Sequence, residues 1–364
     1  MTQILYKIFP GVIFSFAIAY LGIYLSDFVG IKILNLSKSP ISPIMLSIII
    51  GMIIGNILSI PLIFLEGIKF SLKFILRLGI ICLGIRLGLL DILKVGLIGV
   101  PLIVACIVIS ILIVNYLCKI LDVPSKIGSL IAVGTSICGA SAIVATSPAI
   151  NADKEETAYA IANITIFGII AMFLYPFLAH YLFDGNELSV GLFLGTSIHE
   201  TAQVAGAGLI YSEQYNSPIS MDIATITKLV RNVSMIIVIP TISYLYLRKN
   251  LNKNSTKPSI ISMFPIFIIG FIIMGLIRTM GDYGIQNTGS AFIIFHNGQW
   301  QQVIDFIKTI AEYSLAIAMA AVGISTNLGS LKSLGIRPFY VGFSAAVCVG
   351  IVSYIGIILL SNFI

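Results

Sequence analysis

Apolar runs of about 20 residues follow one another along almost the whole sequence, and no other feature constrains the fold as strongly. Only 10% of the residues are Asp, Glu, Lys or Arg, whereas about 25% are charged in an average soluble domain. Lipid solvates apolar side chains directly, but it requires every backbone polar group to be satisfied within the protein. Runs of this length without period-two alternation are typical of transmembrane helices rather than of barrel strands, which are about 10 residues long. We therefore predict an all-α polytopic membrane protein.

About eleven transmembrane segments can be placed on the sequence. They cover residues 8–26, 43–61, 70–90, 95–118, 127–150, 156–182, 188–211, 221–247, 259–280, 304–327 and 337–361. Asp153 and Glu156 match a capping box at the start of the sixth segment. We expect a single transmembrane domain over residues 1–364, within which the basic loop 248–257 separates two candidate halves, 1–247 and 258–364.

Basic residues are unevenly divided between alternate loops. The loops on the N-terminal side hold Lys69, Lys73, Lys119, Lys126, Arg248, Lys249, Lys253, Lys257, Lys332 and Arg337, and those on the other side hold Lys32, Lys38, Lys94, Lys154, Arg278 and Lys308. Because positively charged loops stay inside, we predict a cytoplasmic N-terminus and, with an odd number of segments, an external C-terminus. The net charge of +6 forms no basic stripe with interleaved aromatic residues, which argues against nucleic-acid binding.

Two pairs of similar sequences within the chain suggest inverted-repeat character. Residues 83–96 (LGIRLGLLDILKVG) resemble residues 322–335 (VGISTNLGSLKSLG), and an odd number of segments separates the two copies. Such copies face opposite ways, as in inverted-repeat transporters. The sequence GTSI also recurs, at residues 134–137 and 195–198, but counting segments places these two copies in the same orientation. Either one segment is re-entrant, or the similarity of the two GTSI sequences reflects a shared function rather than an ancestral repeat.

Small and hydroxylated residues gather within two segments that should otherwise be plain helix. Such residues weaken helix continuity, and irregular backbone is tolerated in a membrane only where it is buried in protein or lines a cavity. Broken helices present half-helix N-termini, with their partial positive charge, to an anionic ligand. The alternative is close helix packing through small residues. The candidate anion ligands of this kind are Thr135, Ser136, Gly139, Ser141, Thr196 and Ser197.

His199 and Glu200 are adjacent ionisable residues in an apolar segment. A charge at the centre of a membrane helix costs about 2.5–3.5 kcal/mol, so the pair needs an explanation. We favour a polar cavity, in which His199 contacts substrate or carries a proton, over a boundary position where both residues reach water. The sequence from His199 to Gln203 lacks the second histidine of the HExxH zinc motif, and we expect neither a metal nor a cofactor.

Lys228 and Arg231 are spaced i, i+3 in the eighth segment and therefore share a helical face. Two cations one turn apart repel each other unless an anion or a carboxylate lies between them. One interpretation is that both side chains snorkel to the membrane surface. The other is that the arginine fork and the lysine charge bind an oxyanion together.

Four motifs, in this order, resemble a known family. They are GTSICGASAIVATSPAI at 134–150, ADKEETAYAIANITIFGIIAMFLYP at 152–176, GTSIHETAQVAGAG at 195–208 and KLVRN at 228–232. Over essentially its whole length the chain is similar to the sulfate exporter family, a group of bacterial inner-membrane proteins to which sulfate export is ascribed. That family is in turn similar to the bile acid–sodium symporter and sodium–proton antiporter superfamily. The resemblance implies a panel domain, a core domain and two unwound helices that cross near the membrane midplane, of which only the segment at 127–150 is evident.

We therefore expect a secondary active transporter, not an enzyme, that exports or exchanges a small oxyanion such as sulfate or a sulfonate. His199, Glu200, Lys228 and Arg231 complete its candidate binding site, a proton or sodium ion is the expected coupling ion, and a homodimer is compatible with the sequence. One alternative is a cation–proton antiporter in which Glu200 and His199 carry the ion. Alternatives from other classes are an intramembrane hydrolase, for which a matched base and orienting group are missing, and a membrane sensor that transports nothing.

Overall fold

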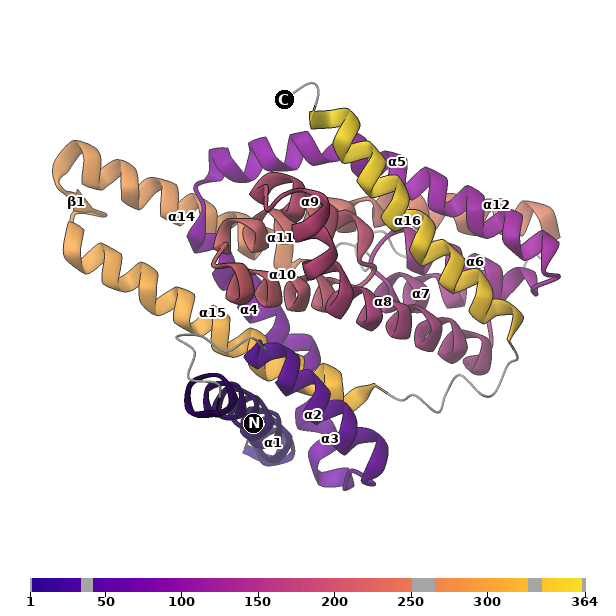
Figure 1. Cartoon of the computed structure of the whole chain (residues 1–364), viewed down its shortest axis with the longest axis horizontal. Helices are drawn as coiled ribbons and strands as arrows, with labels where there is room; N and C mark the ends of the chain where they lie inside the picture. Colours follow the sequence, from indigo (N-terminus) through magenta and orange to yellow (C-terminus); the bar gives the residue numbers. More distant parts are fainter. Residues whose placement is uncertain (1, 34–41, 251–265, 327–335, 362–364) are drawn as a thin grey trace. The chain divides into compact units, whose positions relative to one another are not determined.

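The computed structural model describes residues 2–33, 42–250, 266–326 and 336–361 (Figure 1). Nearly all of these residues are helical, which confirms the expected all-α membrane protein. Within the described part of the chain, six helices are long and apolar enough to cross a membrane, or seven if a bent pair counts as one span. The other expected segments are interrupted or shorter, because glycine, proline and hydroxylated residues break their apolar runs. The expected count of about eleven transmembrane helices, some of them broken, is therefore not confirmed.

The chain divides into two compact units, each assembled from three separate stretches. The first unit comprises Met1–Val95, Leu209–Pro218 and Ile266–Asn327, and the second comprises Gly96–Gly208, Ile219–Pro265 and Leu328–Ile364. Most of the basic loop that was expected to separate two halves lies outside the described residues. The same holds for most of the repeat copy at 322–335.

The first unit is built on α15, which packs against α2 and α4, while α1 packs against α2 and α3. Close backbone approach requires glycine here, since a Cβ added at Gly51 would lie 2.6 Å from the carbonyl oxygen of Ala320. The helices of this unit are α1 (Thr2–Asp27), η1 (Phe28–Ile33), α2 (Pro43–Ile57), α3 (Leu62–Phe70), η2 (Ser71–Ile75), α4 (Leu76–Leu83), η3 (Gly84–Arg86), α14 (Phe267–Thr288) and α15 (Asn297–Ser325). Between α14 and α15, β1 (Ser290–Ala291) pairs with β2 (Phe295–His296) in an antiparallel ribbon.

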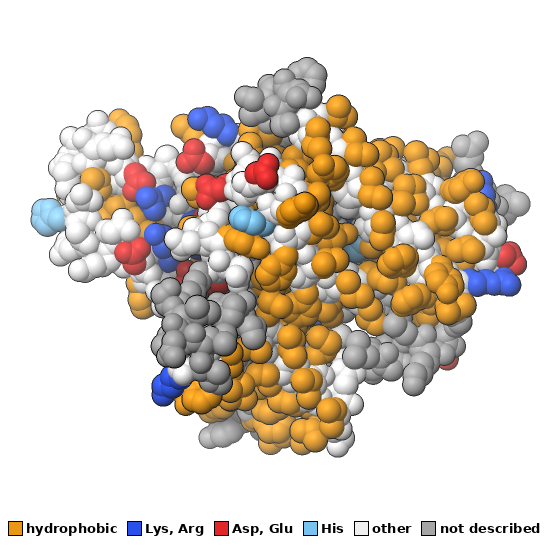
Figure 2. Space-filling model, viewed as in Figure 1, with side chains coloured by type: hydrophobic (Ala, Val, Ile, Leu, Met, Phe, Trp, Pro, Cys, Tyr) orange, Lys and Arg blue, Asp and Glu red, His pale blue; other side chains and the backbone are white. Residues whose placement is uncertain are grey.

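The second unit contains the interrupted helices that carry the candidate site. Its helices are α5 (Leu89–Ile120), α6 (Ser125–Ser136), α7 (Ala140–Thr146), η4 (Ser147–Ile150), α8 (Lys154–Leu182), α9 (Glu187–Ser197), α10 (Thr201–Tyr215), α11 (Pro218–Val233), α12 (Met235–Asn250) and α16 (Arg337–Ser361). Of these, α5 begins and α10 ends in the first unit. Hydrophobic side chains cover much of the visible face of the molecule (Figure 2), as expected for a surface that lipid solvates.

The predicted capping box at the start of α8 is confirmed. The backbone amide of Glu156 donates to Asp153 Oδ1 over 2.7 Å, and the amide of Asp153 donates to Glu156 Oε2 over 2.9 Å. Two amides that the first helical turn leaves unsatisfied are thereby paired. The box fixes the start of α8 directly after η4.

Replacing Asp153 with alanine should lower the free energy of unfolding by about 1 kcal/mol, because one cap hydrogen bond is lost. The thermal unfolding midpoint of the purified protein in detergent measures the change. Lys154→Ala in the same first turn is the matched control, since its side chain has no part in the capping box. Equal unfolding midpoints for the two variants would show that the box does not stabilise α8.

Candidate functional site

The helices α6 and α7 form a re-entrant hairpin rather than one membrane crossing. Lys126, in the first turn of α6, donates from Nζ to the carbonyl oxygen of Asn151 over 2.8 Å, and Asn151 follows η4 directly. A Cβ added at Gly134 of α6 would lie 2.8 Å from Cδ1 of Ile143 in α7. Nine residues of continuous helix would place these two positions about 13 Å apart. The chain therefore enters at the start of α6, turns at residues 137–139 and returns to the end at which it entered.

A second re-entrant hairpin consists of α9 and α10. Its geometry follows from α11, which lies parallel to α9: Ser220 Oγ donates to the carbonyl oxygen of Glu187 over 3.2 Å, and a Cβ added at Gly195 would lie 2.6 Å from Cβ of Thr227. The start of α11 also contacts Gly208 of α10. By Gly208 the chain has therefore returned from the break at residues 198–200 to the level at which α9 begins. Figure 1 shows α9, α10 and α11 side by side.

The two hairpins enter the second unit from opposite ends, because α8 separates them. The first hairpin returns just before α8 begins at Lys154, and the second starts soon after α8 ends at Leu182. With 29 residues, α8 is about 43 Å long, which exceeds the hydrocarbon thickness of about 30 Å. The two GTSI sequences are therefore related by inversion, since each ends the entering helix of its hairpin. The segments expected at 127–150 and 188–211 each fold back to the end at which they start, which resolves the orientation that segment counting left open.

The tips of the two hairpins lie against each other. Gly139, at the first break, has φ 69° and ψ −127°, a backbone conformation that glycine adopts readily and other residues do not. A Cβ added there would lie 3.2 Å from Cβ of Glu200, at the second break. Both of these residues were predicted to belong to the site, and the structure brings them into contact.

Lys228 joins the two tips from α11. Its side chain has no exposed surface, and Nζ donates to the carbonyl oxygens of Ile137 over 2.8 Å and Ile198 over 2.9 Å. It also donates to the carbonyl oxygen of His199. All three carbonyls lie at the breaks, where the half-helices α6 and α9 end, and the ammonium charge complements the negative ends of their dipoles.

Arg231 joins the same two helix ends one turn further along α11. This side chain is also fully buried, and its Nε donates to the carbonyl oxygen of Ser136 over 2.9 Å. From Nη1 it donates to the carbonyl oxygen of Thr196 over 2.6 Å, and from Nη2 to that of Thr135. The snorkelling interpretation of Lys228 and Arg231 is wrong, because neither side chain reaches the surface. Both hold the two hairpin tips together.

The predicted hydroxyl ligands divide according to their hydrogen bonds. Ser136, Thr196 and Ser197 donate to backbone carbonyls of their own helices, over 3.2, 2.7 and 2.5 Å. An anion needs donors, so in this arrangement these three hydroxyl groups cannot serve one. Ser141 lies in the first turn of α7 and is exposed.

Two predicted ligands keep their polar atoms available at the tips. Thr135 Oγ1 and His199 Nδ1 are buried and have no hydrogen-bond partner among the described residues. The imidazole of His199 approaches the backbone of Thr135, which brings the two hairpins together through these residues. Because buried polar side chains are nearly always paired, these two atoms are candidates for contact with a bound molecule.

Sequence reasoning did not identify Gln203 and Asn232 as site residues. Gln203 Nε2 donates to the carbonyl oxygen of Thr165 over 3.0 Å, and Asn232 Nδ2 donates to Thr201 Oγ1 over 3.0 Å. The amide oxygens of both residues are buried without a partner in the described part of the chain. The sequence held one signal for them: Gln203 ends the segment HETAQ and Asn232 ends KLVRN, both within motifs that carry other site residues.

Comparison with known proteins points to one family over nearly the full length of the chain. A family model described as conserved hypothetical protein 698 matches residues 10–342. A UPF0324 membrane protein of Fusobacterium nucleatum is 34% identical over 310 residues, which cover 84% of this chain and 87% of the relative. A UPF0324 membrane protein of Streptococcus agalactiae serotype V is 31% identical over 347 residues, which cover 94% of this chain and 94% of the relative. A UPF0324 membrane protein of Clostridium tetani is 29% identical over 357 residues, which cover 95% of both. No solved structure matches the chain.

Proposed function

Since the chain belongs to the UPF0324 family of membrane proteins, matched by the model of conserved hypothetical protein 698, and buries two opposed hairpin tips, we propose that it is a secondary active transporter of a small oxyanion. Membership confirms a conserved family of membrane proteins, and sulfate export by this family is part of the proposal. We assign sulfate or a sulfonate as the substrate, export or exchange as the activity, and a bacterial inner membrane as the location. The observation that carries the proposal is the buried Lys228–Arg231 pair between the two tips.

The charge at the tips favours an anion over a cation. Lys228 and Arg231 contribute two positive charges, and Glu200 is the carboxylate that acts on Lys228. Helix-end carbonyls offset part of the remaining charge, but a buried charge without a full counter-charge is costly. A bound anion would supply the missing negative charge, whereas a bound cation would be repelled. This argument supports an anion transporter over the cation–proton antiporter.

Hydrogen-bond donors for an anion come from the start of α10. The first amide of this helix with a helical partner is that of Val204, which donates to the carbonyl oxygen of Glu200. The three preceding amides carry the partial positive charge of a helix N-terminus, which binds anions. His199, next to them in sequence, can donate from Nδ1 once it is protonated. We therefore assign His199 both to substrate contact and to carrying a coupling proton.

The distribution of charge between the two ends of the second unit supports a membrane orientation. Basic residues gather at one end of this unit, where α5 ends and where α6, α8 and α16 begin; they are Lys119, Lys126, Lys154 and Arg337. Two acidic residues, Asp184 and Glu187, lie at the opposite end of α8. Because the first hairpin does not cross, Lys154 is on the same side as Lys126, contrary to the assignment made by segment counting. The positive-inside rule then places the basic end in the cytoplasm. A cytoplasmic N-terminus stays the prediction made from the uneven distribution of basic residues along the sequence.

Uptake into proteoliposomes tests the proposed function. The purified protein should accumulate labelled sulfate or a small labelled sulfonate above the level of empty liposomes when a proton or sodium gradient is imposed. Comparing the two gradients identifies the coupling ion. The proposal is lost if no anion is moved above background and none raises the thermal unfolding midpoint of the purified protein.

His199→Ala should lower the uptake rate at least about tenfold, equivalent to about 1.4 kcal/mol of transition-state stabilisation. Its unfolding midpoint should also fall, because the substitution empties a buried site and removes the imidazole that approaches the backbone of Thr135, so uptake is compared at equal amounts of folded protein. The matched control is His180→Ala, at the last turn of α8, which should transport at the wild-type rate. Equal uptake by the two variants would favour a protein in which His199 has no part in transport.

A further inference from the structure

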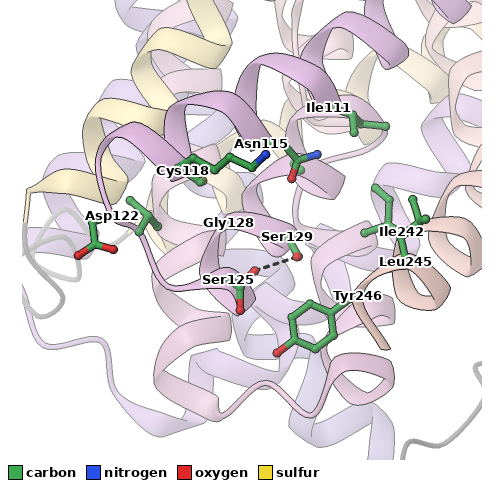
Figure 3. A pocket seen from close by; sticks show the side chains of 13 residues that line it. Ile111, Asn115, Cys118, Asp122, Ser125, Gly128, Ser129, Ile242, Leu245 and Tyr246 are labelled. Carbon is green, nitrogen blue, oxygen red and sulfur yellow. Dashed lines mark hydrogen bonds between the residues drawn. The ribbon is translucent and has the colours of Figure 1, made fainter. Parts of the chain in front are cut away.

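A cavity of about 300 Å³ lies beside the first hairpin, at the end of the second unit where the basic residues gather (Figure 3). Its walls come from the end of α5, the turn before α6, the entering half of α6 and the end of α12. Polar residues line it from several elements: Asn115 and Lys119 of α5, Ser125 and Ser129 of α6, and Tyr246 of α12. The Ser129 hydroxyl donates to the carbonyl oxygen of Ser125 over 2.8 Å, as Figure 3 shows. Apolar residues, among them Ile111, Val123 and Leu245, complete the lining, so water and a hydrated anion would be held along its polar side.

An apolar cluster forms the inner wall of this cavity. We call it the apolar barrier; its buried members are Val133, Ile137, Cys138, Ala142, Met235, Ile239 and Ile242. Ile242 lines the cavity as well, and Ile111, another lining residue, packs against the cluster. Along α6, Ala132 is the last residue that lines the cavity, and the hairpin tip begins at Ile137. This is a distance of about 7.5 Å along the helix axis.

We propose that the cavity is the cytoplasmic vestibule through which a hydrated anion reaches the hairpin tips, and that the apolar barrier closes this route in the present structure. The inference rests on the proposed function, because it names the path to the site described above. Lys119 provides an attractive charge in the vestibule. The negative charge of Asp122 at the rim is offset by Arg337, whose guanidinium lies 4.0 Å away. A hydrophobic constriction of this kind gates a pore by excluding water.

Two native cysteines report on the cavity and on the barrier. Cys118 lines the cavity and is partly exposed, whereas Cys138 lies within the barrier and is 4% exposed. In single-cysteine variants, with the other four cysteines replaced by alanine, each thiol can be labelled with a membrane-impermeant methanethiosulfonate that carries a sulfonate group. Right-side-out and inside-out vesicles present the reagent to opposite faces of the membrane.

We expect Cys118 to react when the reagent is on the cytoplasmic face and not when it is on the external face, with Cys138 reacting at least tenfold more slowly. Opening the barrier with Ile239→Ser or Met235→Ala should speed the labelling of Cys138 at least tenfold and leave Cys118 unchanged. Met235 is suited to this test because its Sδ lies 3.3 Å from Sγ of Cys138. Using two barrier variants keeps the test valid if one of them fails to fold.

Several outcomes would overturn the vestibule. One is that Cys118 resists the impermeant reagent from both faces but reacts with a membrane-permeant maleimide, which would show a lipid-filled cavity. Another is labelling of Cys138 as fast as Cys118 in the otherwise unaltered chain, which would show that no barrier separates them. Labelling does not depend on transport, so the two proposals fail separately. If the protein takes up an anion but Cys118 is not labelled, the vestibule proposal alone is wrong. If Cys118 is labelled from the cytoplasmic face but no anion is taken up, the proposed transport function is wrong.

Discussion

Replacing Arg231 with methionine should abolish anion uptake and lower the free energy of unfolding by at least about 3 kcal/mol. The guanidinium donates to carbonyl oxygens at the C-terminal ends of both α6 and α9, all of them buried. A buried acceptor left without its donor costs about 1–3 kcal/mol, and this substitution removes the partner of several at once. Methionine retains much of the volume of the side chain, so the loss reports on hydrogen bonds and charge. Proteoliposome uptake and the thermal unfolding midpoint measure the two effects.

Two further variants control this experiment. Arg231→Lys keeps the positive charge but not the planar fork that reaches both helix ends, so its unfolding midpoint should lie between those of the wild type and Arg231→Met. Arg337→Met removes an arginine whose side chain is 65% exposed, and it should change stability by no more than about 0.5 kcal/mol. A wild-type midpoint for Arg231→Met would rule out the role of Arg231 in holding the two hairpins together.

Gly139→Ala should also stop transport, through backbone strain and contact at the tips. At φ 69° and ψ −127°, a residue with a Cβ is strained by about 1–3 kcal/mol. The new methyl group would lie 3.2 Å from Cβ of Glu200, closer than ordinary packing allows. To relieve the backbone strain or the close contact with Glu200, one hairpin tip must move away from the other, which changes the site between them. Uptake by the variant, measured beside its unfolding midpoint, distinguishes a displaced tip from a protein that no longer folds.

Gly298→Ala is the matched control for Gly139. Gly298 lies in the first turn of α15, and a Cβ added there meets no atom within 4 Å. The substitution should leave transport unchanged and stability equal or slightly higher, because alanine is a better helix former than glycine. If Gly139→Ala instead transports as fast as Gly298→Ala, the contact between the two tips is not required for activity.

The membrane fold could be predicted from the sequence, but the path of the chain through it could not. Low charge and long apolar runs are sufficient to predict helices in lipid. A hairpin of two half-length helices, however, has the same length and composition as one spanning helix. What distinguishes them is the hydrogen bond between Lys126 and Asn151, 25 residues apart. No periodicity in the sequence encodes that contact, so residues 127–150 were expected to cross.

The types of residue in the site could be predicted better than their roles. The i, i+3 spacing correctly placed Lys228 and Arg231 on one face of α11, but it could not show that this face meets the ends of two other helices. Thr196 and Thr135 occupy similar places in the sequence. The hydroxyl group of Thr196 donates to its own helix, whereas that of Thr135 has no partner among the described residues. Such differences depend on tertiary packing and are invisible in a list of residue types.

A structure determined with selenate, a close analogue of sulfate, tests the central claim most directly. Selenium scatters anomalously, so its position can be found independently of the surrounding density. We predict a selenium peak between the two hairpin tips, within hydrogen-bonding distance of His199 and of the first amides of α10. A well-occupied selenate bound elsewhere, with none between the tips, would contradict the assignment of this site to the transported anion.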